Sequence, residues 1–187
     1  RNEESPFVFR AVNRLDRDTS GLVLLAKNPY SSCVLSDAVK DHTIHREYAA
    51  IVSGKTDASG TIDLPIARKD GSTIERVLDP ERGETAVTHY RTFAYNKNAD
   101  LSFIRLLLET GRTHQIRVHM KAIGHPLPGD FLYCPDYRFI DRQPLHSTYL
   151  SFSHPVTGEK LEFSAPLAGH MRKLFPNIKD PSGPVFY

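Results

Sequence analysis

The stretch Asn13-Arg14-Leu15-Asp16-Arg17-Asp18-Thr19-Ser20-Gly21 places four charged side chains and two hydroxyl groups within nine residues. The apolar segment Leu22-Val23-Leu24-Leu25-Ala26 follows at once and ends at Lys27. Because this segment is short, it predicts a buried strand rather than a helix. A charged loop held against a buried strand often places reactive groups on a rigid scaffold. The same pattern also fits a solvated turn before a strand, so the rest of the chain must decide between the two.

The composition limits what kind of protein this is. The chain has 187 residues, enough for one domain with a sizeable core. Its 24 Lys and Arg against 22 Asp and Glu give a net charge of +2, so nucleic-acid binding requires a local basic patch. Two cysteines, Cys33 and Cys134, make neither a disulfide framework nor a metal site, which suits a reducing cytoplasm. No apolar run approaches a membrane span or a signal-peptide core.

The order of patterns predicts an α+β domain with a mixed, largely antiparallel sheet and flanking helices. Strands are expected where β-branched and aromatic residues gather, and helices where apolar residues recur every three or four positions. The expected strands are 7–9, 22–26, 45–52, 87–93, 101–109, 145–153 and 160–163, with turns and short hairpins over 55–85. The expected helices are 29–40, 113–123 and 167–175.

Two of these helices carry further expectations. In the first, Asn28 caps the N-terminus, Tyr30, Val34 and Ala38 form the apolar face, and Cys33 lies in the core. In the second, Thr113 is the cap, and Gly124 and Pro126 end the helix.

The second helix also has a polar face. His114, Arg117 and Lys121 fall at i, i+3 and i+7, so all three project the same way. His114, His119 and His125 do not have the spacing of a known zinc site, so we expect no metal here.

Five segments, in one order, resemble RluA-type RNA pseudouridine synthases. Residues 14–21 (RLDRDTSG) resemble the aspartate signature of that family, residues 46–54 (REYAAIVSG) its tyrosine strand, and residues 110–120 (TGRTHQIRVHM) its third motif. Residues 124–130 (GHPLPGD), and 145–147 (LHS) followed by His154-Pro155, match further family segments. The resemblance runs from about Val12 to Leu174 and implies the catalytic fold of pseudouridine synthases.

The chain departs from the family pattern in two places. Asn13 stands where most relatives have His, at a position that is not catalytic in the family. The family also has an upstream strand with a Lys-Pro-Ala-Gly-like segment, and many relatives carry a small N-terminal RNA-binding module. The chain begins at Arg1, after both. We therefore expect residues 1–187 to be a single catalytic domain that lacks these parts, with an unpaired sheet edge.

The resemblance implies specific roles in uridine isomerisation, which needs no metal, redox cofactor or energy source. Asp16 would be the ionised carboxylate, attacking the sugar C1′ or the base C6, or taking the 2′ proton; the sequence does not choose among these. Arg117 would hold Asp16 by an ion pair, because its planar fork fits a carboxylate. Tyr48 would stack on the flipped uracil and help remove the C5 proton. Arg14 would fill the gap left by the flipped nucleotide, or contact a phosphate.

Each role has a plain structural alternative. Asp16 could instead cap a turn, Tyr48 could be an ordinary core aromatic, and Arg117 could be a surface cation. RNA contacts are expected from Arg14, Arg17, Arg112, His114 and Lys121. With Arg10 and Arg117, the basic residues among them would line one cleft if the loop and the helix meet.

Rival functions remain open at this stage. A nucleosidase or glycosidase needs a second carboxylate, for which Asp18 is the near candidate. A non-catalytic RNA-binding relative is the other rival. By family analogy, large-subunit ribosomal RNA is the expected substrate and transfer RNA the alternative. We expect a cytoplasmic monomer with RNA as its partner and no membrane or metal.

Overall fold

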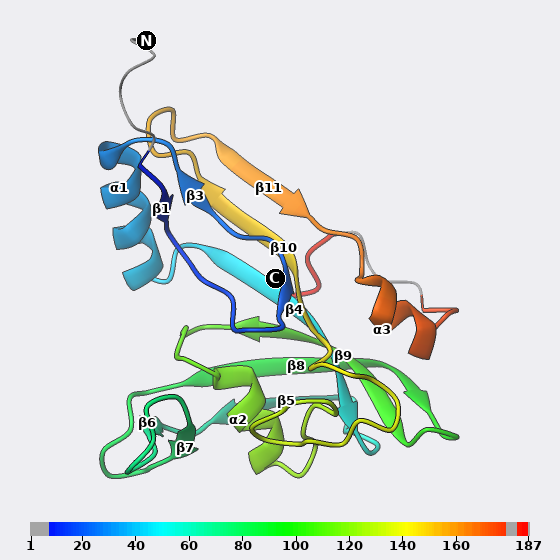
Figure 1. Ribbon diagram of the computed structural model, residues 1–187. Helices are drawn as coiled ribbons and strands as arrows, with labels where there is room; N and C mark the ends of the chain where they lie inside the picture. Colours follow the sequence, from blue (N-terminus) through cyan, green and yellow to red (C-terminus); the bar gives the residue numbers. More distant parts are fainter. Residues whose placement is uncertain (1–7, 179–182, 187) are drawn as a thin grey trace.

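The computed structural model describes residues 8–178 and 183–186, which form one long sheet with helices on both of its faces (Figure 1). The strands are β1 Arg10–Ala11, β2 Ser20–Gly21, β3 Leu25–Ala26, β4 His45–Ser53, β5 Ser59–Asp63, β6 Ile66–Arg68, β7 Arg76–Leu78, β8 Val87–Asn96, β9 Leu101–Leu108, β10 Leu145–Ser153 and β11 Lys160–Ser164. The helices are α1 Pro29–Lys40, α2 Gln115–Ala122 and α3 Gly169–Leu174.

The main sheet has the order β11-β10-β4-β9-β8-β5, and every neighbouring pair along it is antiparallel. Strand β2 adds to it in parallel with β10, pairing Ser20 with His146 and Gly21 with Ser147. Two small ribbons, β1-β3 and β6-β7, lie apart from it. The predicted α+β class with a mixed, largely antiparallel sheet is confirmed.

Alternation along the central strands divides the core between the two faces of the sheet. Tyr48, Ala50 and Val52 of β4 pack with Ile116 and Met120 of α2. Their neighbours Ala49 and Ile51 point the other way, toward Leu167, Met171 and Phe175 around α3. Helix α2 and helix α3 therefore cover opposite faces.

Helix α1 begins as predicted, and its predicted apolar face is confirmed in part, because Ala38 packs on a core cluster but Tyr30 does not. The Asn28 side chain accepts a hydrogen bond from the Ser31 amide, at 2.8 Å, and Pro29 occupies the first turn. The buried residues are Ser31 and Leu35, whereas Tyr30 is exposed. Cys33 is also exposed, so its assignment to the core is wrong. The helix is therefore rotated about its own axis relative to the orientation that would bury Tyr30.

The predicted strand over 22–26 is wrong. Strand structure covers only Ser20–Gly21 and Leu25–Ala26, which pair with different partners, β10 and β1. Val23 and Leu25 are each 44% exposed, so the segment is a half-buried crossing from the main sheet to the β1-β3 ribbon. Similarly, Val8 and Phe9 are exposed and precede β1, while Phe7 lies outside the described residues.

The other predicted elements are found with small shifts of their ends. Strand β8 runs three residues beyond the predicted end at Phe93, and β9 ends at Leu108. Residues 55–85 hold β5 and the β6-β7 hairpin. Thr113 does not cap α2: the cap position is His114, in the left-handed conformation at φ 58°, with no capping side chain.

On the α3 face, a buried ion pair fastens the C-terminal segment to the sheet. Arg105 Nη2 donates to Glu47 Oε2 at 2.9 Å, and neither side chain is exposed. The Glu47 carboxylate also accepts from the amides of Val185 and Phe186. Burial alone raises the pKa of Glu47, but the hydrogen bonds from His45 and from these amides, with the charge of Arg105, lower it.

Within the described ranges, none of the helices is both long and apolar enough to cross a membrane.

Candidate active site

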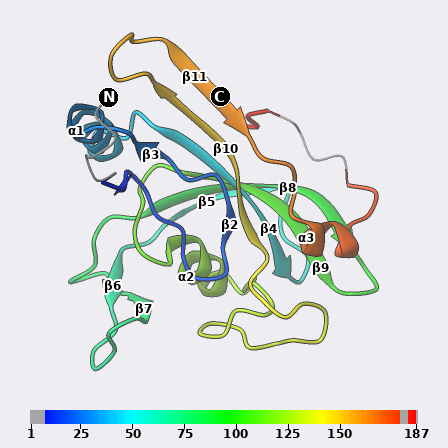
Figure 2. The same ribbon diagram turned by 45° about the horizontal axis from the view of Figure 1, so that its top comes forward.

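The loop that carries Asp16 is fastened to the start of β10 and to the residues just before it. The Ser147 carbonyl accepts from the Leu22 amide at 3.1 Å, and Ser20 Oγ lies 2.8 Å from His146 Nδ1. Arg142 donates to the Asp18 carbonyl, and Gln143 donates to Thr19 Oγ1. Figure 2 shows β2 running beside β10 above α2. Contacts with residues far away in the sequence thus hold the loop in place, as a site on a rigid scaffold requires.

Within the loop, the main chain forms its own turn, so Asp16 is not needed as a cap. The Thr19 amide donates to the Asp16 carbonyl at 3.0 Å, and Asp18 adopts φ 68°. Asn13 accepts from the Leu24 amide at 2.7 Å, which braces the base of the loop. The Asp16 carboxylate remains free to contact α2.

Arg117 of α2 joins Asp16 to a second carboxylate. Its Nη1 lies 3.2 Å from Asp16 Oδ2, while Nε and Nη2 hold Asp130 at 2.6 and 2.8 Å. The Arg117 side chain is 1% exposed, Asp130 is fully buried, and Asp16 is 18% exposed. Arg117 is therefore not a surface cation. Burial disfavours its charge, yet the two carboxylates raise its pKa.

The polar face predicted for α2 exists, and it surrounds Tyr133. Arg117 Cζ lies 4.9 Å and Lys121 Nζ 5.7 Å from the centre of the Tyr133 ring, and the His114 ring meets it edge-on. The Tyr133 hydroxyl accepts from the Arg76 amide and lies 2.9 Å from His114 Nδ1. Burial raises the pKa of Tyr133 to about 12 and lowers the pKa of His114. The contact between the hydroxyl and the imidazole orients both rings.

A pocket opens between the Asp16 loop, β4 and the start of α2. Its lining includes Asp16, Tyr48, Arg46 and His114, together with Arg14, Leu15, Thr19, Leu108, Gly111, Arg112, Gln115, Ile116 and Leu145. Tyr48 is 6% exposed and belongs to the core cluster on the α2 face. Burial raises the pKa of Tyr48, so the neutral phenol faces the pocket. The pocket thus combines one carboxylate, an aromatic side chain and several basic side chains.

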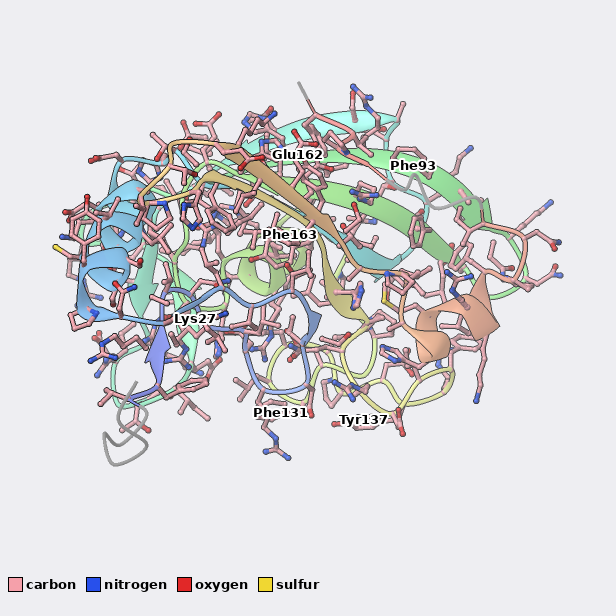
Figure 3. The ribbon with its side chains drawn as sticks, turned by 90° about the horizontal axis from the view of Figure 1, so that it is seen from above. Lys27, Phe93, Phe131, Tyr137, Glu162 and Phe163 are labelled. Carbon is pink, nitrogen blue, oxygen red and sulfur yellow. The ribbon has the colours of Figure 1, made fainter. Side chains whose placement is uncertain are left out.

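The structure separates the predicted basic residues into two sets. Arg14 and Arg112 line the pocket, and Arg112 is held by Glu84 and the Thr85 carbonyl. Arg17 and Lys121 do not line it: the exposed Arg17 lies over the Phe131 ring, 5.2 Å from its centre. Arg10, further off, donates to the Val8 carbonyl. Figure 3 shows Phe131 and Tyr137 along one edge of the molecule, both exposed.

Sequence reasoning missed three residues of this site. Asp130 ends the family-like segment 124–130, but no role was assigned to it. Tyr133 follows three residues later in an irregular connection, where no periodicity marks a buried side chain. Arg46 was detectable, because it precedes Tyr48 by two residues on one strand and must share its face.

The three histidines considered as metal ligands have separate partners. His114 meets Tyr133, His119 the Leu64 carbonyl, and His125 the Ser53 carbonyl. Across residues 8–178 and 183–186, no group of three or more His, Cys, Asp or Glu side chains is placed to hold a metal ion.

The chain is similar to several known RNA pseudouridine synthases. The chain is 50% identical over 164 residues to an uncharacterized RNA pseudouridine synthase of Bacillus subtilis (strain 168), YjbO, covering 87% of this chain and 57% of the relative. It is 41% identical over 177 residues to the ribosomal large subunit pseudouridine synthase D of Zymomonas mobilis, covering 88% of this chain and 54% of that one. The chain spans about half the length of these curated relatives.

Among solved structures, human RNA pseudouridylate synthase domain containing 1 superposes with a TM-score of 0.74 at 28% identity, over 85% of this chain and 69% of that one. The family model described as RNA pseudouridylate synthase matches residues 1–122, which include the Asp16 loop, Tyr48 and Arg117. This chain belongs to the RNA pseudouridylate synthase family, and within it to the RluA type.

Proposed function

We propose that this protein isomerises specific uridines in structured RNA to pseudouridine, with Asp16 as the catalytic carboxylate. The observation that carries the proposal is the Asp16 carboxylate itself: it is partly exposed in a pocket, held by a buried arginine and faced by Tyr48. A pocket of this kind accepts a base that has left its helical stack.

The reaction requires few groups from the protein. The bond from C1′ to N1 breaks, the base turns, and a bond from C1′ to C5 forms; N1 gains a proton and C5 loses one. Asp16 acts on the sugar or the base while Arg117 holds its carboxylate in place. Attack at C1′, attack at C6 and removal of the 2′ proton all suit a carboxylate at this position.

Tyr48 supplies the wall on which uracil stacks. Because its phenol is neutral, Tyr48 can receive the C5 proton only as it passes its own proton on. Arg14, exposed at the pocket mouth, fills the gap left by the flipped nucleotide. Arg112 and His114 line the entrance and contact the RNA backbone beside it.

Large-subunit ribosomal RNA is the substrate class that we propose. Several relatives carry the name ribosomal large subunit pseudouridine synthase D, among them those of Zymomonas mobilis and Vibrio parahaemolyticus. RNA of this size is recognised mainly by folded shape and unpaired loops, which suits a concave pocket with a basic rim.

The test compares the full-length protein with its Asp16→Asn variant on unmodified ribosomal and transfer RNA transcripts, with pseudouridine mapped by chemical labelling. We expect site-specific product from the parent in ribosomal RNA and none from the variant. The variant should still fold, because Arg117 keeps both hydrogen bonds to Asp130.

Asp18→Asn is the matched control, since it makes the same change two residues away. Asn tolerates the left-handed backbone at this position, and the Asp18 side chain meets only the exposed Arg17, at 3.7 Å. The control should form product at the parent rate. Equal product from Asp16→Asn would refute the catalytic role, free uracil would indicate a glycosidase, and salt-sensitive binding without product would indicate a non-catalytic relative.

A further inference from the structure

Arg46 is a buried cation without a counter-charge in the described part of the chain. Three arginines are buried there: Arg105 pairs with Glu47, and Arg117 pairs with Asp130 and Asp16. Arg46 is 8% exposed, and its buried Nε has no hydrogen-bond partner among the described residues. A buried charge of this kind is costly unless something pairs with it.

The guanidinium lies in the pocket of Asp16 and Tyr48. Arg46 and Tyr48 are two residues apart on β4, so they share the face that the pocket covers. The connection 110–112 lies beside the guanidinium, and its Gly111 and Arg112 also line the pocket. A Cβ added to Gly111 would come within 3.0 Å of Arg46 Nη2, so this glycine leaves room for the guanidinium beside the main chain.

The pocket contains more positive than negative charge. Asp16 is the one acidic residue in its lining, and Arg117 already binds it. Arg112 is held by Glu84 at the entrance and Arg14 is exposed at the pocket mouth, which leaves Arg46 to act on a ligand inside the pocket. A neutral uracil carbonyl would leave the charge of Arg46 uncompensated, whereas a phosphate pairs with it through two parallel hydrogen bonds.

We propose that Arg46 binds a backbone phosphate that flanks the flipped uridine. This inference rests on the proposed function, since it takes the pocket ligand to be a nucleotide of RNA. It assigns Arg46 a role in binding rather than in the bond-breaking steps. Anchoring the phosphate beside Tyr48 fixes where the base enters the pocket, so that the sugar comes to lie over Asp16.

The test measures RNA binding in the full-length protein, in an Asp16→Asn background where no turnover occurs. The probe is the tightest-binding member of a panel of short hairpins from large-subunit ribosomal RNA, and affinity is followed across a range of salt concentrations. Arg46→Gln should weaken binding by about 10- to 100-fold, as expected for loss of a charged hydrogen bond. The slope of log K against log salt should fall by about 0.7–0.9, the value for one phosphate contact.

Arg172→Gln is the matched control: it makes the same change on an exposed residue of α3, on the opposite face of the sheet. It should bind within twofold of the parent. Stability gives an independent readout, because removing an unpaired buried charge should leave the melting temperature unchanged or raise it. Arg46→Lys keeps the positive charge but not the planar guanidinium. Its salt slope should therefore be closer to that of the parent than its affinity is.

The inference would be overturned if Arg46→Gln bound as tightly as Arg172→Gln, or if its lost binding came with a lower melting temperature. The first result means that no phosphate contacts Arg46, and the second that Arg46 is structural. Binding needs no turnover, so the outcome stands apart from that of the activity assay. If RNA binding depended on Arg46 but the parent formed no pseudouridine, the proposed function would be refuted and the role of Arg46 in binding would stand.

Discussion

Arg117 contacts two carboxylates whose surroundings differ, and this difference separates their roles. Asp130 is fully buried, receives two hydrogen bonds from Arg117, and its Oδ1 also accepts from the amides of Leu132 and Tyr133. Asp16 receives one longer bond and is partly exposed in the pocket. Asp130 therefore positions Arg117, and through it Asp16, while Asp16 is the carboxylate that can reach a substrate.

Replacing Asp130 tests this division of roles. In Asp130→Asn the loop amides keep their acceptor, but the charged pair with Arg117 is lost, so we expect the free energy of unfolding to fall by about 1–3 kcal/mol. Single-turnover pseudouridine formation should slow at least 10-fold, with hairpin affinity unchanged, because Asp16 is no longer held.

Asp136→Asn, which breaks the exposed pair with Arg138 on the same connection, is the control and should cost less than about 1 kcal/mol. A slowed Asp136 variant, or an Asp130 variant with parental single-turnover rates, would show that Asp130 does not position the site.

At the scale of elements, an irregularity in β10 holds the loop that carries Asp16. The register of β10 against β4 shifts between Ser147 and Tyr149. At that point Ser147 pairs with β2, and its carbonyl accepts from Leu22. The bulge thus turns one residue of a central strand toward the Asp16 loop, a common use of bulges beside active sites.

Gly21 makes this contact possible. Its φ is +109°, and a Cβ there would lie 2.2 Å from the Ser147 carbonyl oxygen. Gly21→Ala must therefore separate β2 from β10, and we expect it to destabilise the protein by more than 3 kcal/mol, roughly the range for a severe packing clash, and to abolish activity. Urea unfolding and pseudouridine formation measure the two effects.

Gly158→Ala is the control that shows how much stability is lost through backbone strain alone, without a close contact. Gly158 has φ +74° but nothing within 4 Å of an added Cβ, so this change should cost only about 1–2 kcal/mol and leave activity intact. Similar losses in the two variants would mean that the approach of β2 to β10 is not what Gly21 protects.

At the scale of the whole molecule, buried and half-buried histidines make stability depend on pH. His114 and His119 of α2, His146 of β10 and His170 of α3 all have their pKa lowered, mainly because burial disfavours the charged ring. In the unfolded chain they take up a proton near pH 6.5. The unfolded state therefore binds more protons below that pH, and stability falls as pH decreases from about 6.5 toward the folded pKa values.

His119 offers the sharpest test of this dependence, since it is fully buried between Thr88 and the Leu64 carbonyl. We expect the urea midpoint of the parent to fall between about pH 7.5 and about pH 5.5, and that of His119→Gln to fall less, because one titrating ring is gone. His42→Asn, in the exposed turn after α1, should keep the parental slope. Parallel profiles for the parent and the His119 variant would contradict the assignment.

Much of the fold follows from local pattern. The cap at Asn28 and the strands over 45–52, 145–153 and 160–163 depend on neighbours in sequence, and these predictions are confirmed. The segment 22–26 does not form one continuous strand, because it connects two pairings with different partners. Ser20–Gly21 pair with β10, and Leu25–Ala26 pair with β1. The face of α1 was likewise decided by what packs on it, and not by the helix alone.

The sequence by itself determined the class of sheet, the family and the pair Asp16 and Arg117, which lie 101 residues apart but belong to recognisable motifs. Only the tertiary structure showed that Asp130 shares Arg117, that Tyr133 fills the space beneath it and that Arg46 is buried without a counter-charge. The physical reason is that motifs record residue types along the chain, whereas pairing and burial depend on which distant segments the sheet brings together. A charge is satisfied or unsatisfied only once its neighbours in space are known.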